Sequence, residues 1–125
     1  MGRNVAVWGD MTTPEVGPGD LFIVSAGPGD LATARALADV ARRDGARAAL
    51  VTAQREGELA RRVDVVTVIP AQTMADDRGA QPSVLPMGSL FEVSQMLAFE
   101  LAILKLRPRF HETAETMRAR HTNLE

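Results

Sequence analysis

The sequence predicts an α/β protein in which a parallel β-sheet is flanked by helices in three layers. Short apolar runs alternate with segments of helical periodicity along the 125 residues, and the glycine-rich segment 27–30 separates a predicted strand from a predicted helix. Parallel strands need a crossover connection, which is usually a helix. A chain of this length can bury a core without disulfides or metals, so a single domain over residues 1–125 is expected.

Each element follows from the spacing of apolar residues. Residues 5–8 and 21–24 are expected to form buried strands, and residues 48–51 and 65–69 two more strands. Helical spacing starts at Leu31 and ends at Asp44 and Gly45, where glycine can supply a left-handed cap. Further helical segments are expected around residues 56–61, 89–106 and 112–120. Helix 89–106 is apolar around most of its circumference, so one face is expected to pack against a partner chain.

Composition narrows the class of function. With 46% hydrophobic and 24% charged residues, the chain has a net charge of −2, which predicts no binding to nucleic acid or to an anionic membrane. Cysteine is absent, so thiol nucleophiles, disulfides and zinc–thiolate sites are excluded. No apolar run approaches the roughly 20 residues of a membrane span, and no signal-peptide pattern opens the sequence. These features predict a cytoplasmic protein.

The glycine loop at 27–30 allows three interpretations. Backbone N–H groups between a strand and a helix can hold a phosphate. The spacing Gly27-x-Gly29-x-x-Ala32 also matches a dinucleotide fingerprint, although no acidic residue ends the next strand. The third interpretation is a tight turn in which Asp30 caps the helix. The spacing does not distinguish this turn from an anion site.

Two other motifs carry groups able to move protons. Ser89 and Glu92 have the spacing of a capping box, which spacing alone favours over a chemical role. A carboxylate such as Glu92 and an imidazole such as His121 nevertheless suit proton transfer at neutral pH. Residues 76–78, Asp-Asp-Arg, lie in a long loop that could be a lid or a solvated segment, and the solvated segment is favoured. The two adjacent carboxylates have no nearby histidine, so they are poor metal ligands.

The chain resembles the sugar isomerase (SIS) domain family, and within it the 6-phospho-3-hexuloisomerases. The matching segments are 5–10 (VAVWGD), 12–14 (TTP), 19–21 (GDL), the glycine loop, 63–66 (VDVV), 69–70 (IP), 86–92 (PMGSLFE) and 120–125 (RHTNLE). The resemblance implies a flavodoxin-like fold and a homo-oligomer, dimeric or tetrameric. It also implies an aldose/ketose-type proton shift, through an enediolate, between 3-hexulose 6-phosphate and fructose 6-phosphate, with no metal or cofactor.

The same resemblance implies roles for individual residues. Glu92 matches the proposed catalytic base, and His121 matches a histidine that a neighbouring subunit contributes. The residues expected to bind the phosphosugar at the carboxyl edge of the sheet are Ser25, Gly27, Gly29, Asp30 and Ser89.

The chain departs from the family pattern in two places. The family loop reads Ser-Gly-Ser-Gly-Glu-Thr, whereas residues 26–31 read Ala-Gly-Pro-Gly-Asp-Leu, which leaves Ser25 as the nearby hydroxyl. The family's first helical segment, first strand and first phosphosugar loop have no counterpart here. A non-catalytic phosphosugar-binding or regulatory module is therefore the alternative expectation.

Overall fold

The computed structural model describes residues 3–76, 78 and 83–123. The chain divides into two compact units. One is formed by Pro14–Gln95, and the other by Met1–Thr13 together with Met96–Glu125. The single domain expected over 1–125 stays a prediction.

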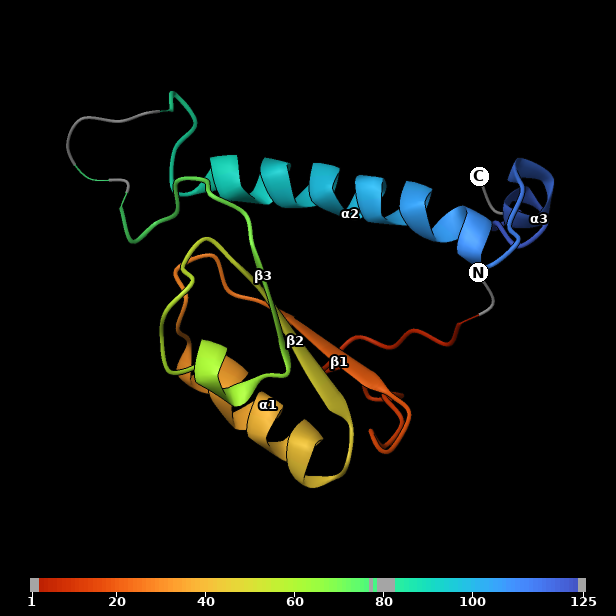
Figure 1. Ribbon diagram of the computed structural model, residues 1–125, viewed down its shortest axis with the longest axis horizontal. Helices are drawn as coiled ribbons and strands as arrows, with labels where there is room; N and C mark the ends of the chain where they lie inside the picture. Colours follow the sequence, from red (N-terminus) through yellow and green to blue (C-terminus); the bar gives the residue numbers. More distant parts are fainter. Residues whose placement is uncertain (1–2, 77, 79–82, 124–125) are drawn as a thin grey trace. The chain divides into compact units, whose positions relative to one another are not determined.

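A three-stranded parallel sheet forms the centre of the unit Pro14–Gln95 (Figure 1). Its strands are β1 (Leu21–Ser25), β2 (Arg47–Thr52) and β3 (Val65–Val68), in the spatial order β1-β2-β3. Ser25 at the end of β1 lies opposite Val51 of β2. Helix α1 (Ala32–Arg43) makes the first crossover, and a path through the 3-10 turn η1 (Ala60–Arg62) makes the second. The predicted α/β class, with parallel strands flanked by helices, is confirmed.

Small residues allow α1 to pack closely on one face of the sheet. Ala34, Ala38 and Ala41 form its buried side, and the core beneath them includes Leu50 and Leu59, which are fully buried. The helix ends where predicted, because Gly45 takes a φ of +91° and its N–H donates to the Arg42 carbonyl. Burial of this apolar surface is the main source of stability for the unit.

Two strand predictions need correction. Residues 5–8 form no strand, and Val5 and Trp8 are 88% and 60% exposed. The Val7 carbonyl instead accepts hydrogen bonds from the Asp10 N–H at 3.2 Å and the Thr13 hydroxyl at 2.7 Å, so the segment closes on itself as a turn.

The second correction concerns 21–24, which forms β1 as expected but is not fully buried. Leu21 and Ile23 are each 54% exposed, because alternate residues of a strand face opposite sides and only Phe22 and Val24 pack on the core.

The helical segments differ from prediction mainly at their ends. Helix α2 (Ser89–Arg109) begins where predicted and runs three residues longer. Helix α3 (Ala114–Arg118) is shorter than the predicted 112–120, because Thr113 and Thr116 form a capping box that fixes its start. Around 56–61 only the turn η1 forms. Within the described residues, no helix is long and apolar enough to cross a bilayer; the cytoplasmic location stays a prediction.

Candidate functional site

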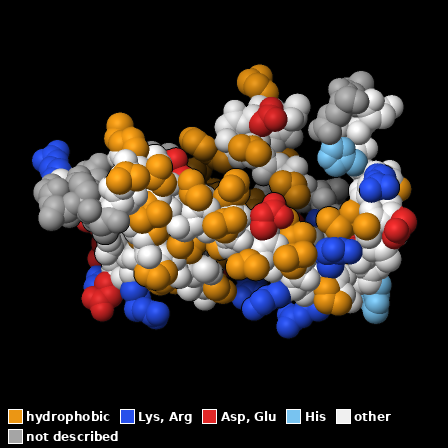
Figure 2. Space-filling model, turned by 90° about the horizontal axis from the view of Figure 1, so that it is seen from above, with side chains coloured by type: hydrophobic (Ala, Val, Ile, Leu, Met, Phe, Trp, Pro, Cys, Tyr) orange, Lys and Arg blue, Asp and Glu red, His pale blue; other side chains and the backbone are white. Residues whose placement is uncertain are grey.

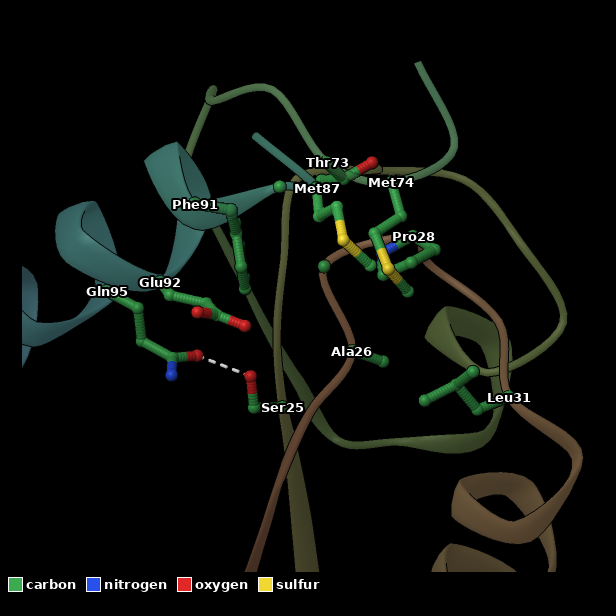
Figure 3. Close-up of a pocket in the computed structure, with 12 residues that line it drawn as sticks. Ser25, Ala26, Pro28, Leu31, Thr73, Met74, Met87, Phe91, Glu92 and Gln95 are labelled. Atoms are coloured by element: carbon green, nitrogen blue, oxygen red, sulfur yellow. Dashed lines mark hydrogen bonds between the residues drawn. The ribbon is translucent and has the colours of Figure 1, made fainter. Parts of the chain in front are cut away.

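A pocket of about 280 Å³ opens at the carboxyl end of β1 (Figure 3). Four segments build its walls: the end of β1 with the glycine loop, residues 73–74, residues 87–88 and the first two turns of α2. In parallel α/β sheets, ligands bind in crevices outside the carboxyl ends of the strands. The position of the pocket therefore makes it the candidate site of the unit Pro14–Gln95.

The glycine loop is fastened to the neighbouring strand by its own backbone. The Ala26 N–H donates to the Val51 carbonyl at 2.9 Å, and the Gly27 carbonyl accepts from the Ala53 N–H at 3.1 Å and from the buried Thr52 hydroxyl at 3.3 Å. A Cβ on Gly27 would lie 2.8 Å from the buried ring of Phe91. Glycine is required there so that the loop and the start of α2 can approach each other.

Backbone donors remain available at the mouth of this loop. In the described structure, the N–H groups of Gly27, Asp30 and Leu31 have no backbone acceptor. Leu31 is the N-cap of α1 and offers no side-chain oxygen to the first turn, so that turn also keeps free donors. Such donors and the positive end of the helix dipole attract an anion.

One wall of the pocket is polar and carries the carboxylate. Glu92 and Gln95 are three residues apart on α2 and therefore share a face. The Ser25 hydroxyl donates a hydrogen bond to Oε1 of Gln95, as Figure 3 shows beside the Glu92 carboxylate. A carboxylate, a hydroxyl and an amide thus line one wall, and the hydroxyl and amide come from residues 70 positions apart.

The opposite wall is apolar. It is formed by Pro28, Leu31, Met74 and Met87 (Figure 3). Among the described residues that line this pocket there is no Lys, Arg or His. An anion bound here would therefore meet neutral donors of this unit, chiefly the backbone N–H groups.

Residues 73–88 are shaped by two local devices. Asp76 accepts from the Thr73 N–H at 2.6 Å and from the Thr73 hydroxyl at 2.9 Å, and these bonds hold the pKa of Asp76 below its usual value. Gly88 takes a φ of +79° and packs against the backbone of residues 73–74. Both devices fix the part of the wall that Thr73 and Met74 contribute. Asp76 is exposed, as expected for a solvated segment, and its carboxylate also accepts these local bonds; Asp77 lies outside the described residues.

The predicted site residues reach different places. Ser25, Gly27 and Glu92 line the pocket. Gly29 is buried and is not among the described lining residues, and a Cβ added to it would be 2.7 Å from the Gln54 side chain. Asp30 faces solvent and pairs with Arg35 at 3.2 Å.

Both capping predictions at the site are wrong. Asp30 does not cap α1, since the N-cap is Leu31. Ser89 is already the first helical residue, and its hydroxyl donates to the Pro86 carbonyl at 2.7 Å, so it forms no capping box with Glu92. The Gly88 carbonyl accepts the Phe91 N–H instead.

His121 belongs to the other unit, Met1–Thr13 with Met96–Glu125. It follows α3, and its Nδ1 lies 3.3 Å from the Thr122 carbonyl. In the same unit, Glu112 accepts from the Thr116 hydroxyl at 2.6 Å and pairs with Arg120. These bonds lower the pKa of Glu112 to about 2, with the Thr116 hydroxyl as the largest cause.

Three residues of the site were missed by sequence reasoning. Gln95 and Thr73 line the pocket although no motif contains them, and Met87 lines it although its motif, 86–92, gave it no role. The spacing Glu92-x-x-Gln95 could have indicated a shared helix face, and Thr73-x-x-Asp76 a local hydrogen-bonded turn. Met87 carries no such signal, because its positive φ of 53° is visible only in the folded backbone.

The fold and pocket define a parallel α/β domain with a carboxylate, Glu92, in a pocket at the carboxyl edge of its sheet. No family model matches the chain. It is 31% identical over 125 residues to the 3-hexulose-6-phosphate isomerase of Bacillus subtilis. The match covers all of this chain and 68% of that protein. It is 36% identical over 124 residues to the enzyme of the same name from Mycobacterium gastri, covering 99% of this chain and 62% of that one.

A solved structure shares the fold. It is that of a hypothetical protein from Methanococcus jannaschii for which a 3-hexulose-6-phosphate isomerase function has been inferred, with a TM-score of 0.76 and 22% identity over 94% of this chain and 62% of that one. The chain thus spans about two thirds of the length of these proteins. It belongs to the 3-hexulose-6-phosphate isomerase family.

Proposed function

We propose that this protein is a phosphosugar isomerase that interconverts 3-hexulose 6-phosphate and fructose 6-phosphate. The observation that carries the proposal is the Glu92 carboxylate, which faces the pocket at the carboxyl edge of the sheet in a chain of this family. The reaction moves a carbonyl group between neighbouring carbons, so it needs a base that removes a proton from one carbon and returns one to the other.

Glu92 is proposed to be that base. It abstracts the proton on C2 of 3-hexulose 6-phosphate, which gives an enediolate over C2 and C3. Glu92 then returns its proton to C3, and the proton on O2 moves to O3, which leaves the C2 carbonyl and C3 hydroxyl of fructose 6-phosphate. Atoms and electrons balance without an oxidant or reductant. His121 is proposed to assist the transfers between oxygens from a neighbouring subunit, because an imidazole titrates near neutral pH.

The phosphate is proposed to bind at the glycine loop. The available N–H groups of Gly27, Asp30 and Leu31 and the uncapped start of α1 support this assignment. The Ser25 hydroxyl is the closest in sequence to those that positions 26, 28 and 31 lack, but it donates to Gln95, which leaves the phosphate to the backbone donors. Gly29 and Ser89 are proposed to shape the backbone around the phosphate rather than to contact the sugar.

A homo-oligomer, a dimer or a tetramer, is part of the proposal. Helix α2 exposes large apolar side chains, whose contact with water is unfavourable and which typically mark an interaction surface. Those that are 41–60% exposed are Val93, Met96, Leu97, Phe99, Leu101 and Leu104. Figure 2 shows hydrophobic side chains of this kind at the surface. Light scattering at micromolar concentration tests the assembly. A monomer would contradict it, together with the proposed role of His121.

The activity is tested by following fructose 6-phosphate formation from 3-hexulose 6-phosphate. Glu92→Gln keeps the shape of the side chain but cannot accept a proton, and general-base catalysis is worth roughly 10²–10⁴-fold. Glu100→Gln, also on α2 and exposed but outside the pocket, is the matched control. Equal rates for the wild type and Glu92→Gln would refute the assignment.

The loop substitutions favour one alternative function, a phosphosugar-binding module without catalysis. Pro28 offers no N–H, and Ala26 and Leu31 offer no hydroxyl where the family has them. Stabilisation against heat by fructose 6-phosphate, with no turnover of either sugar phosphate, is the result that would favour this alternative.

A further inference from the structure

The polar wall of the pocket contains one pair that no family motif predicts. Ser25 ends β1, and Gln95 lies one helical turn beyond Glu92 on α2. The Ser25 hydroxyl donates to Gln95 Oε1, which holds the amide plane of Gln95 in a fixed orientation beside the carboxylate (Figure 3). The orientation of this amide is therefore determined by β1 as well as by its own helix.

The hydrogen-bond donors of the lining side chains can be assigned one by one. Three lining side chains, Ser25, Thr73 and Gln95, carry an O–H or N–H group. The Ser25 hydroxyl donates to Gln95, and the Thr73 hydroxyl donates to Asp76. The two N–H groups at Nε2 of Gln95 have no acceptor among the described residues. Gln95 is the lining side chain with donors left for a ligand.

The proposed chemistry needs a donor at this place. Removal of a proton beside a carbonyl group places negative charge on an oxygen, and donors already aimed at that oxygen lower the barrier. A carboxylate that acts as the base only accepts hydrogen bonds, and the described lining residues include no Lys, Arg or His. An amide N–H three residues from the base on the same helix face meets the requirement.

We propose that Gln95 is a catalytic residue whose Nε2 donates to the substrate oxygen on which charge develops, O2 or O3 of the sugar. Ser25 is a positioning residue that acts through the amide of Gln95. The inference rests on the isomerase function proposed above, and it adds the side-chain donor that the pocket otherwise lacks.

The test measures three variants: Gln95→Met, Ser25→Ala and the double variant that carries both changes. The control is Ser94→Ala, because Ser94 also lies on α2 but is not among the described lining residues. Methionine matches glutamine in length and helix propensity but has no donor. Loss of a hydrogen bond to a charged group predicts a fall in kcat of about 10- to 100-fold for Gln95→Met, with a smaller change in KM because the charge develops only in the transition state. The double variant should be no slower than Gln95→Met, since Ser25 acts through Gln95.

Two measurements separate this inference from the proposed function. If the wild type isomerises the sugar phosphate and Gln95→Met retains wild-type kcat, the inference is overturned and the function stands. If the wild type does not turn over, calorimetry with fructose 6-phosphate decides: weaker binding by Gln95→Met but not by Ser94→Ala supports contact with the ligand, and equal or undetectable binding overturns it. Should Gln95→Met fail to fold, unchanged kcat in Ser25→Ala would refute the pairing.

Discussion

Gly88 provides a test of the architecture that is independent of function. It precedes α2 with a φ of +79°, in the left-handed region, and an added Cβ would lie 2.8 Å from the Met74 amide nitrogen. The carbonyl carbon and Cα of Thr73 would both be 3.1 Å away. All three neighbours are backbone atoms, so no side-chain rotation can relieve the overlap. The contact fixes the distance between two walls of the pocket.

The cost of Gly88→Ala has two parts. The left-handed conformation costs a non-glycine residue roughly 1–2 kcal/mol. Forcing a methyl group into a filled space adds typically about 1–3 kcal/mol. We therefore expect the free energy of unfolding to fall by about 2–5 kcal/mol, a large part of the ~5–15 kcal/mol that stabilises a small domain.

Gly19→Ala is the matched control. Gly19 has a φ of +91° in the same unit, but nothing lies within 4 Å of its added Cβ. Only the conformational part, roughly 1–2 kcal/mol, should be lost there. Urea unfolding followed by circular dichroism at one fixed protein concentration measures both variants. If Gly88→Ala were no less stable than Gly19→Ala, the proposed contact between Gly88 and residues 73–74 would be refuted.

Three further changes test individual hydrogen bonds. The pKa of Glu112 is lowered from 4.5 to about 2, so the contribution of this group to stability is complete above pH 4.5 and is lost as the pH falls through about 2. Thr116→Ala should raise the pKa of Glu112 toward 4.5 in an NMR titration. An unchanged pKa would contradict the hydrogen bond between the two side chains. Asp76→Ala should speed hydrogen exchange at the Thr73 amide by about fivefold, given a typical bond of ~1 kcal/mol, whereas unchanged protection would mean that the bond contributes nothing. Pro28→Ser supplies an N–H and a hydroxyl to the loop and should tighten fructose 6-phosphate binding about tenfold or more by calorimetry, and no gain would place the phosphate elsewhere.

The parts of the fold that follow local patterns could be predicted from the sequence. The α1 segment ends at Gly45 because a left-handed cap is encoded by a single residue type. Residues 5–8 could not be predicted, because a short apolar run becomes a strand only if its backbone finds a partner, and here the Val7 carbonyl bonds within its own turn. Capping patterns failed for the same kind of reason. Ser89 has the right spacing from Glu92, but its hydroxyl finds the Pro86 carbonyl first.

The lining of the candidate pocket could be predicted from the sequence only in part. Glu92 could be predicted because the motif that carries it is contiguous, whereas Gln95 is defined by the Ser25 hydroxyl, 70 positions away. Hydroxyls missing from the glycine loop would weaken phosphate binding, yet the same loop leaves three backbone donors without acceptors in the described structure. In the proposed function, phosphate affinity and proton transfer therefore depend on different groups in one pocket. Substitutions in the loop should therefore change KM, and substitutions on α2 should change kcat.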